Sequence, residues 1–329
     1  MEADFKESVF RIGNETDFAN CALEVFRFQA ENNRVYREYL SLLGVRAETV
    51  KSIEEIPFLP IEFFRNHQVI SDNRPVQKVF ESSGTAGTTT SRHYVSDLDL
   101  YEKSFTLAFK LFYGDPQEYF FAMLLPSYLE RENSSLVYMA DHLIRNSSDK
   151  RSSFYLDDHE KLLATLEEIC AEKKKGILLG VSFALLDLAE KYSPDLGGIT
   201  IVETGGMKGR RKEITREELH ATLKTRFRTC AVHSEYGMTE LLSQAWSKGE
   251  GIFRTPPWMR IRLREINDPL SVFDEPGITG GINIIDLANC NSCSFIATGD
   301  LGRLLPGGSF EVLGRFSASD LRGCNLLVD

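Results

Sequence analysis

Residues 80–91 read FESSGTAGTTTS, and this stretch decides how the rest of the chain is interpreted. Glycine, serine and threonine make up most of it. Glycines let a backbone approach a ligand and adopt positive φ, while hydroxyls and successive backbone N–H groups donate to phosphate oxygens. The stretch is therefore typical of a phosphate-binding loop, although a plain surface turn has a similar composition. It matches neither GxxxxGK[ST] nor GxGxxG, the two standard nucleotide-binding patterns.

Three further motifs follow this stretch in order: EYGMTE at 235–240, TGD at 298–300 and GR at 314–315. Together, the four resemble the adenylate-forming enzymes, the superfamily of acyl-CoA synthetases and related ligases. Within it the chain resembles the acyl-protein synthetases of bacterial fatty acid reductase complexes (LuxE-like), relatives of phenylacetate-CoA ligase. The resemblance covers nearly the whole chain. Its finer matches are IPFLP at 56–60, TGGMK at 204–208, HSEYGMTELLSQ at 233–244 and RGCNLLV at 322–328.

Composition excludes several classes of function. The 329 residues carry a formal net charge of −10, which argues against a nucleic-acid or anionic-membrane surface. The start has no basic segment before an apolar run, and no apolar run reaches the roughly 18 residues that a membrane span needs. Six scattered cysteines do not form a disulfide framework. We therefore expect a cytoplasmic protein with no membrane span and with reduced cysteines.

Apolar runs and helical patterns alternate through the middle of the chain. This alternation predicts an α/β fold with mainly parallel sheets flanked by helices. Ligands bind at the carboxyl ends of such strands, where the glycine-bearing loops lie. The expected strands are 77–81, 119–125, 176–181, 199–202 and 229–233. The expected helices begin near Asp97 or Asp99 and cover 134–145, 160–174, 183–191 and 216–227.

The two ends of the chain have different patterns. Residues 4–43 show helical spacing of apolar side chains, whereas short apolar runs broken by Gly and Pro predict β-hairpins from Pro256 on. We therefore expect residues 1–255 to form a helical cap and an α/β nucleotide-binding core. Residues 256–329 would form a β subdomain that ends in a short acyl-accepting tail.

The resemblance implies ATP and Mg²⁺ as cofactors and a carboxylic, specifically fatty, acid as substrate. It assigns Glu240 to Mg²⁺, Tyr236 to the adenine, Thr239 to the α-phosphate and Asp300 to the ribose hydroxyls. From the residues alone, Glu240 also fits a solvated acid at a helix start, and Asp300 fits a turn. The implied ATP-binding residues are Ser82, Ser83, Gly84, Thr85, Gly87, Thr88, Gly205, Gly206, Tyr236, Gly237, Asp300 and Arg315.

The chain lacks two lysines that the superfamily pattern contains. Only fourteen residues follow Arg315, so we expect the mobile C-terminal lid domain and its catalytic lysine to be absent. No lysine follows Gly87 either. A cation should stabilise the charge that develops on the phosphates. Lys208 is the candidate, with Arg92 behind it, and a solvated surface lysine is the other interpretation.

Cys324 suggests the acceptor of the acyl group. Phenylacetate ligases read RGVN where this chain reads RGCN at 322–325, and acyl-protein synthetases carry a near-terminal cysteine that takes the acyl group. A thiolate that attacks the acyl-adenylate would form a thioester, which Arg322 could favour. A small buried apolar residue is the alternative role for Cys324.

The resemblance also implies an acyl-CoA reductase-like protein partner that receives the acyl group. Two rival functions stay open: a phenylacetate-type CoA ligase, and a degenerate adenylate-binding scaffold without catalysis. Cys290 and Cys293 have the CxxC spacing of zinc ligands. Zinc requires four ligands, however, and Cys230 and His233 would face opposite sides of an expected strand.

Overall fold

The computed structural model describes residues 5–71, 74–82, 90–125, 133–156, 158–205, 211 and 214–316. The chain forms two compact units that interleave along the sequence. The first unit comprises residues 1–101, 239–243 and 254–329, and the second comprises residues 102–238 and 244–253. The division at residue 255 inferred from the sequence stays a prediction.

The first unit is built on an antiparallel sheet in the order β12-β11-β13-β14-β15, with β1 added parallel to β14. Antiparallel hairpins after Pro256 are thus confirmed. Its strands are β1 (Leu59–Pro60), β2 (Lys78–Glu81), β3 (Arg92–Val95), β11 (Met259–Arg264), β12 (Val272–Phe273), β13 (Thr279–Asp286), β14 (Phe295–Leu304) and β15 (Phe310–Arg315). Its helices are α1 (Phe5–Ser8), α2 (Glu15–Asn32), α3 (Arg34–Leu42) and α4 (Phe63–Asn66).

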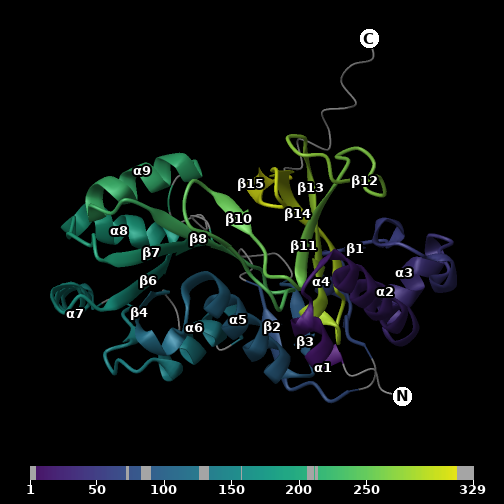
Figure 1. Cartoon of the computed structure of the whole chain (residues 1–329), viewed down its shortest axis with the longest axis horizontal. Coiled ribbons are helices and arrows are strands. Elements are labelled where there is room, and N and C mark those ends of the chain that lie inside the picture. The colour runs from purple at the N-terminus through teal and green to yellow at the C-terminus, as the bar shows by residue number, and fades with distance from the viewer. Residues whose placement is uncertain are drawn as a thin grey trace, which may run out of the picture. The chain divides into compact units, whose positions relative to one another are not determined.

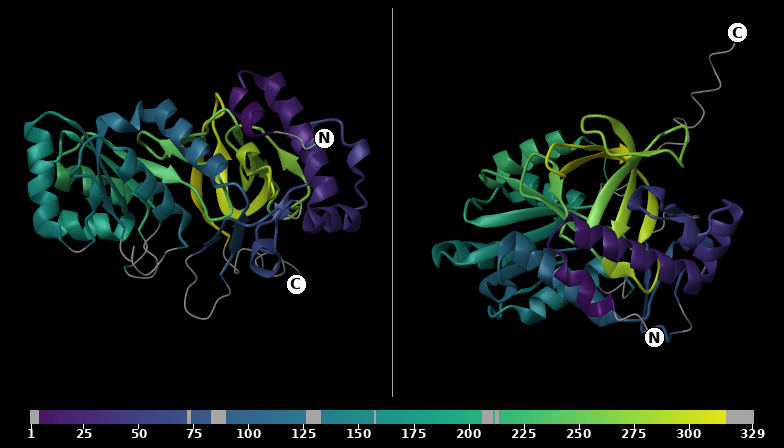
Figure 2. Two further views of the ribbon diagram at one scale, coloured as in Figure 1. Left: turned by 90° about the horizontal axis from the view of Figure 1, so that it is seen from below. Right: turned by 45° about the vertical axis from the view of Figure 1, so that its right-hand side comes forward.

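Helices α2 and α3 cover this sheet, as Figure 2 shows for the purple helices beside the yellow-green strands. The side chain of Asn14 caps α2 by accepting from Asp17 N, and Asn33 ends α2 and caps α3 in the same way. Apolar residues at helical spacing give α2 one buried face. From that face Phe26 packs edge-on against Phe295 of β14, with ring centroids 6.0 Å apart.

Strands β2 and β3 pair with each other in a two-stranded antiparallel sheet. The sequence predicted the strand at 77–81 correctly, but the structure places it outside the parallel sheet. Ser82 N donates to Ser91 O at 3.0 Å, and Ser91 N donates to Ser82 Oγ at 2.9 Å. These two hydrogen bonds extend the pairing of β2 and β3 to Ser82 and Ser91.

The second unit contains the expected parallel sheet, in the order β8-β7-β6-β4-β5, with β9 antiparallel on β8 and β10 beyond it. Every residue of β4 is buried, as a strand covered on both faces requires. The strands are β4 (Tyr119–Leu124), β5 (Ser153–Phe154), β6 (Lys175–Val181), β7 (Ile199–Thr204), β8 (Val232–Tyr236), β9 (Ala245–Ser247) and β10 (Ile252–Arg254). The helices are α5 (Leu98–Tyr113), α6 (Ser135–Asn146), α7 (His159–Ala171), α8 (Ser182–Tyr192) and α9 (Arg216–Phe227).

The helices cover both faces of this parallel sheet. Figure 1 shows α8 and α9 on one side of the strands and α5 and α6 on the other. Right-handed crossovers require this arrangement, because β6, β7 and β8 follow one another in one direction across the sheet while β5 lies on the far side of β4. The carboxyl ends of β7 and β8 therefore lie side by side at one edge.

One strand prediction had the wrong bounds. The sequence predicted a strand over 229–233, but β8 runs from Val232 to Tyr236. Arg228 ends α9 in the left-handed conformation, and Thr229 N still bonds back to Lys224 O. The first residues after α9 thus belong to its C-terminal turn, and the first two residues of EYGMTE lie inside the strand.

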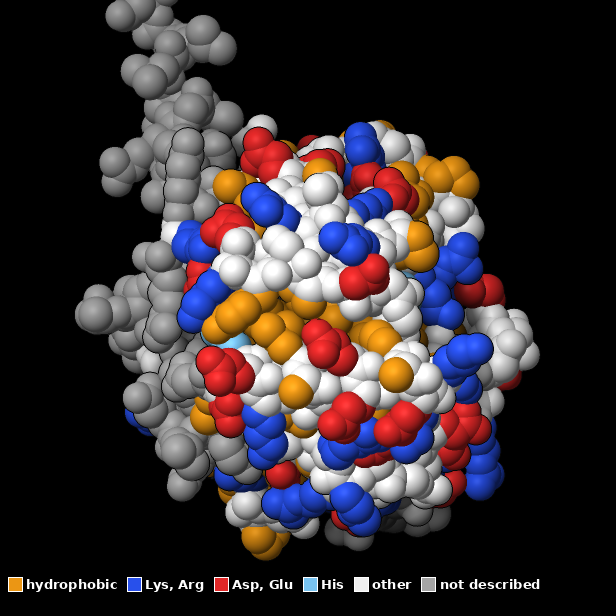
Figure 3. Space-filling model, turned by 90° about the vertical axis from the view of Figure 1, so that its left-hand side faces the viewer, with side chains coloured by type: hydrophobic (Ala, Val, Ile, Leu, Met, Phe, Trp, Pro, Cys, Tyr) orange, Lys and Arg blue, Asp and Glu red, His pale blue; other side chains and the backbone are white. Residues whose placement is uncertain are grey.

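The surface carries charges of both signs. On the face in Figure 3, acidic and basic side chains intermingle around a central band of hydrophobic side chains. One exposed network joins Arg151 to Asp149, Glu168 and Glu172 at 2.7–3.0 Å. Within the described ranges, no helix is long and apolar enough to cross a membrane.

Replacing Phe26 with alanine should lower the free energy of unfolding by about 3–5 kcal/mol, because the ring is fully buried and its loss leaves a cavity beside Phe295. Urea unfolding followed by circular dichroism measures the change. Leu42→Ala is the matched control: Leu42 is 87% exposed, so the expected effect is within about 0.5 kcal/mol. Equal effects of the two substitutions would contradict this account of the core.

Candidate functional site

The candidate residues that the structure describes fall into two sets, one in each unit. The first-unit set is Ser82, Thr239, Glu240, Asp300 and Arg315, and the second-unit set is Gly205, Tyr236 and Gly237. The remaining candidates lie outside the described residues: Ser83, Gly84, Thr85, Gly87, Thr88, Gly206, Lys208 and Cys324.

Glu240 is the most buried acid of the first-unit set, with 4% of its surface exposed. Burial raises the pKa of its carboxyl above the ordinary value, against the hydrogen bond from Ser91 and the charges of Arg315 and Arg65. Residue 240 lies in a turn and no helix begins there, so the solvated helix-start interpretation is wrong. A carboxylate held in so little water is suited to bind a cation.

Asp300 and Arg315 face each other across β14 and β15, where they are directly paired in the antiparallel register. Arg315 Nε donates to Asp300 Oδ1 at 3.1 Å. Asp300 lies within β14, which continues to Leu304, and this excludes the alternative of a turn aspartate. Its side chain is 9% exposed while that of Arg315 is 86% exposed, so a ligand could reach this ion pair from the arginine side.

A buried guanidinium supports the TGD segment from beneath, and sequence reasoning missed it. Arg264 Nη1 donates to Ile282 O and to Asn283 Oδ1, both at 2.8 Å, and Nη2 donates to Thr298 O. Because the buried carbonyl of Thr298 receives a charge-assisted bond, the backbone two residues before Asp300 is fixed. The period-2 pattern MRIRLR at 259–264 was the available signal, since an arginine that alternates with apolar residues can still point inward.

The backbone of Thr239 and Glu240 is held by a second network that the sequence did not reveal. His93 Nδ1 lies 2.9 Å from Thr239 O, and His93 Nε2 lies 3.0 Å from Asn289 Oδ1. Asn289 Nδ2 in turn donates to Glu240 O at 2.8 Å. Burial lowers the pKa of His93 to about 4, so the ring is neutral at pH 7 and donates from one nitrogen at a time.

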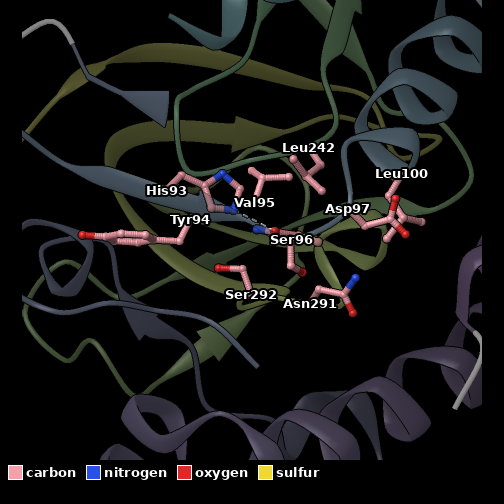
Figure 4. Close-up of a pocket in the computed structure, with 10 residues that line it drawn as sticks. His93, Tyr94, Val95, Ser96, Asp97, Leu100, Leu242, Asn291 and Ser292 are labelled. Atoms are coloured by element: carbon pink, nitrogen blue, oxygen red, sulfur yellow. Dashed lines mark hydrogen bonds between the residues drawn. The ribbon is translucent and has the colours of Figure 1, made fainter. Parts of the chain in front are cut away.

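Figure 4 shows the small cavity beside this network, with His93, Ser96 and Leu242 around it. Its volume is about 10 Å³, which is room for about one water molecule and far too small for a nucleotide. Ser96 Oγ is buried there without a hydrogen-bond partner among the described residues. The cavity therefore belongs to the packing behind Thr239 and Glu240 and is not a substrate pocket.

The turn after Glu240 is fixed by one buried acid. Asp286 accepts from Leu242 N at 2.8 Å, from Ser243 N at 3.0 Å and from Ser243 Oγ at 2.5 Å. Burial raises the pKa of Asp286 to about 6, although these donors favour its charged form. The acid therefore links the 239–243 segment to the end of β13.

The second-unit set lies at the carboxyl ends of β7 and β8. Gly205 follows β7 with φ of +64°, a conformation that favours glycine, and its carbonyl accepts from Ser182 Oγ at 2.5 Å. Tyr236 ends β8, and its ring packs edge-on against Phe253 at 5.9 Å. Gly237 is exposed directly after it. The structure thus places the three residues on two neighbouring strand ends, as expected for a ligand-binding edge.

The remaining sequence candidates have structural roles. Arg92, the reserve cation, is paired with Glu81 at 3.5 Å across β2 and β3. Cys290 and Cys293 are buried, and burial raises the pKa of both thiols to about 12, so they are protonated at neutral pH. Across the described ranges, no group of three or more His, Cys, Asp or Glu side chains could hold a metal ion. That finding gives no support to a zinc site at these cysteines.

The fold is similar to that of solved structures that include a CoA synthetase and a CoA ligase. Solved structures with this fold include ATP-bound MatB from Rhodopseudomonas palustris, at 16% identity and a TM-score of 0.55 over 74% of this chain and 50% of that one. A double mutant of o-succinylbenzoate CoA synthetase (MenE) from Bacillus subtilis gives 18% identity and 0.51 over 74% and 49%. A long-chain-fatty-acid-CoA ligase (FadD1) from Archaeoglobus fulgidus gives 15% and 0.51 over 77% and 55%.

These likenesses concern the fold, and the chain spans about half the length of the structures it matches. No protein-family model matches the sequence. No curated protein matches it either.

Replacing Asn289 with alanine should lower the free energy of unfolding by about 2–3 kcal/mol, because the carbonyls of Glu240 and Cys293 both lose a buried donor. Urea unfolding measures the change. Asn291→Ala is the control: the backbone carbonyl there, which alanine keeps, accepts from Ser71 N. An unchanged midpoint for Asn289→Ala would show that the network does not hold the 239–240 backbone.

Proposed function

We propose that this protein is an ATP-dependent ligase that activates a carboxylic acid as its acyl-adenylate. One observation carries the proposal. Ser82, Ser91, Glu240, Arg315 and Asp300 come from four separate parts of the chain, yet they form one connected series in the first unit. Hydrogen bonds join Ser82 to Ser91, Ser91 and the charge of Arg315 both act on the pKa of Glu240, and Arg315 is paired with Asp300.

This series has the chemistry that adenylation requires. A carboxylate oxygen attacks the α-phosphorus of ATP, the bond to the β-phosphate oxygen breaks, and pyrophosphate leaves. The site must therefore position phosphates, balance their charge and fix the ribose. Ser82 is bonded to Ser91 where the hydroxyl-rich sequence begins, Asp300 supplies two acceptor oxygens for ribose hydroxyls, and Arg315 supplies an exposed cation beside them.

Glu240 fits a magnesium ion that is shared with a substrate. Mg²⁺ in nucleotide enzymes is bound by one or two carboxylates together with substrate phosphates and water. The first-unit set has two buried carboxylates, Glu240 and Asp300, of which Asp300 is paired with Arg315. The described residues offer no cage of three or more ligands. The ion would neutralise phosphate charge when bound. Glu240 would hold it while the His93–Asn289 network keeps the backbone of Glu240 in place.

We further propose that the substrate is a fatty acid and that the acyl group passes to Cys324. The thiolate would attack the acyl carbonyl carbon, AMP would leave, and the product would be a thioester that a reductase-like protein partner can accept. This step rests on the resemblance of RGCN at 322–325 to the acyl-protein synthetases.

Glu240→Gln should lower the rate of MgATP-dependent pyrophosphate release by about 100-fold or more, since preorganised charge at a transferring phosphate contributes this much. The assay uses a ladder of saturated carboxylic acids and also identifies the preferred length. Glu275→Gln, an exposed acid of the same unit, is the control and should keep the wild-type rate. A Glu240→Gln rate equal to wild type would remove the proposed role, and no release by wild type with any acid would indicate a non-catalytic scaffold.

Cys324→Ser should abolish the acyl adduct on the protein while pyrophosphate release continues. Intact-mass spectrometry after incubation with ATP, Mg²⁺ and acid measures a hydroxylamine-labile adduct. Cys230→Ser controls for nonspecific acylation, because Cys230 is an exposed cysteine. If wild type releases pyrophosphate but carries no adduct, the acceptor is CoA or a partner protein and the Cys324 proposal fails.

A further inference from the structure

The two loops of the second-unit set begin at a shared group of buried polar side chains. In the parallel register of β7 and β8, Glu203 pairs with Ser234 and Thr204 pairs with Glu235. All four residues are buried. Neither the proposed adenylation chemistry nor the stability of an ordinary parallel sheet requires two carboxyl groups at this position.

Glu235 contacts both loops. Thr204 Oγ1 donates to Glu235 Oε2 at 2.5 Å, immediately before Gly205. On the other side, Glu235 Oε1 lies against the Cα of Gly237 so closely that an added Cβ would come within 3 Å of it. The side chain of Glu235 thus fills the space between the end of β7 and the residue after Tyr236.

Two basic side chains of α9 lie close to Glu203. Arg216 Nε lies 3.5 Å and His220 Nε2 lies 3.6 Å from Glu203 Oε1, both from α9. Burial alone would raise the pKa of Glu203, but the hydrogen bond from His220 and the charge of Arg216 outweigh it and hold the pKa below its ordinary value. Glu203 is therefore the charged acid of the pair.

Among the residues that the structure describes, Glu235 has no such compensation from the groups that face it. These are the anionic Glu203 and neutral Thr204 on β7 and the phenol of Tyr113 on α5. Burial, together with the charge of Glu203, raises the pKa of Glu235 to about 7, although the hydrogen bond from Thr204 opposes the shift. A substantial share of the molecules therefore keeps this carboxyl neutral at pH 7.

We propose that Glu235 is a positioning residue whose protonated carboxyl fastens the Thr204–Gly205 segment to the Tyr236–Gly237 segment in the arrangement that binds the nucleotide. The inference rests on the proposed function, in which these segments contact the adenine. A neutral carboxyl can still accept from Thr204 in this dry space, whereas a carboxylate beside the charged Glu203 is repelled and needs water. Nucleotide binding should therefore weaken as the pH rises through about 7.

The direction in which folding stability changes with pH follows from the pKa of Glu235 in the folded and the unfolded protein. The folded-state pKa of Glu235 lies above the ordinary value of 4.5, so the folded protein binds this proton more tightly than the unfolded chain does. The stabilisation from this proton is fully present at low pH and is lost as the pH rises toward 7. Glutamine imitates the protonated carboxyl and removes that dependence.

The experiment compares the dissociation constant of AMP at pH 6, 7 and 8 for wild type, Glu235→Gln and the exposed control Glu167→Gln, by titration calorimetry. If only the protonated form binds, the wild-type constant should rise about tenfold more than that of Glu235→Gln between pH 6 and 8. Glu167→Gln should follow wild type. All other titrating groups of protein and ligand are the same in the glutamine variant. The ratio of the two rises in dissociation constant therefore reports the titration of Glu235 alone.

Parallel pH profiles for wild type and Glu235→Gln would overturn the inference. Thr204→Val is the second variant, needed if Glu235→Gln fails to fold. It removes the hydrogen bond that favours the charged form, so the wild-type midpoint should move to higher pH, while Thr204→Ser should restore it. An unmoved midpoint in Thr204→Val would also overturn the inference.

Amide hydrogen exchange without ligand separates this inference from the proposed function. After correction for intrinsic exchange, protection of the Gly205 and Gly237 amides should fall between pH 6 and 8 in wild type and stay level in Glu235→Gln. If wild type binds no nucleotide yet shows this loss of protection, the proposed function fails and the fastening role of Glu235 holds. If protection is equally level in both proteins, the fastening role fails.

Discussion

The hydrogen-bonded ladder of β14 is the constraint on which the first unit depends. This ten-residue strand pairs with β13 on one side and β15 on the other, and β1 adds to it in parallel. Its first residue, Phe295, receives the aromatic side chains of the N-terminal helices. Five positions on, the same strand presents Asp300 opposite Arg315. Because one rigid strand carries both the core contact and the candidate ribose ligand, the position of Asp300 is set by the packing of the whole unit.

Buried charge is the second constraint, and the structure treats each buried charge differently. Arg264 is satisfied by carbonyl and amide oxygens, Glu203 by the nearby Arg216, and Asp286 by donors from a single turn. Glu240 and Glu235 are less fully compensated, and burial raises the pKa of both. Unpaired buried carboxyl groups cost stability. Glu235 and Glu240 lie at the two ends of the EYGMTE segment. Perturbed carboxyl groups that lower stability are expected at positions that bind a ligand.

The sequence predicted the secondary structure well wherever a local pattern was strong. Continuous apolar runs located β4 and β6, and α9 has the bounds 216–227 that the sequence predicted. The β8 error arose because residues that follow a left-handed C-cap have the composition of a strand. For Asp300, the sequence left a turn open as an alternative, since Gly-Asp is common in turns and nothing local shows that β14 continues through it.

The candidate site could be assembled from motifs only in part. Glu240, Asp300 and Arg315 stand in recognisable motifs, but the groups that hold them do not. His93 is 146 residues from Thr239 and 196 from Asn289, so no spacing rule connects them. His220 gave no functional signal in a helical segment of the sequence, yet it faces Glu203 across α9 and β7. These contacts join residues that are far apart in the sequence, so they can be predicted only when the topology of the fold is known.

Burial of the cysteines has a consequence for chemoselectivity. An enzyme that generates an activated acyl group exposes its own nucleophiles to that group. In Cys21, Cys290 and Cys293, burial raises the pKa to about 11, 12 and 12. At neutral pH the reactive thiolate is then roughly one part in ten thousand or less. Under the proposed function, burial would make these three thiols poor competitors for the activated acyl group.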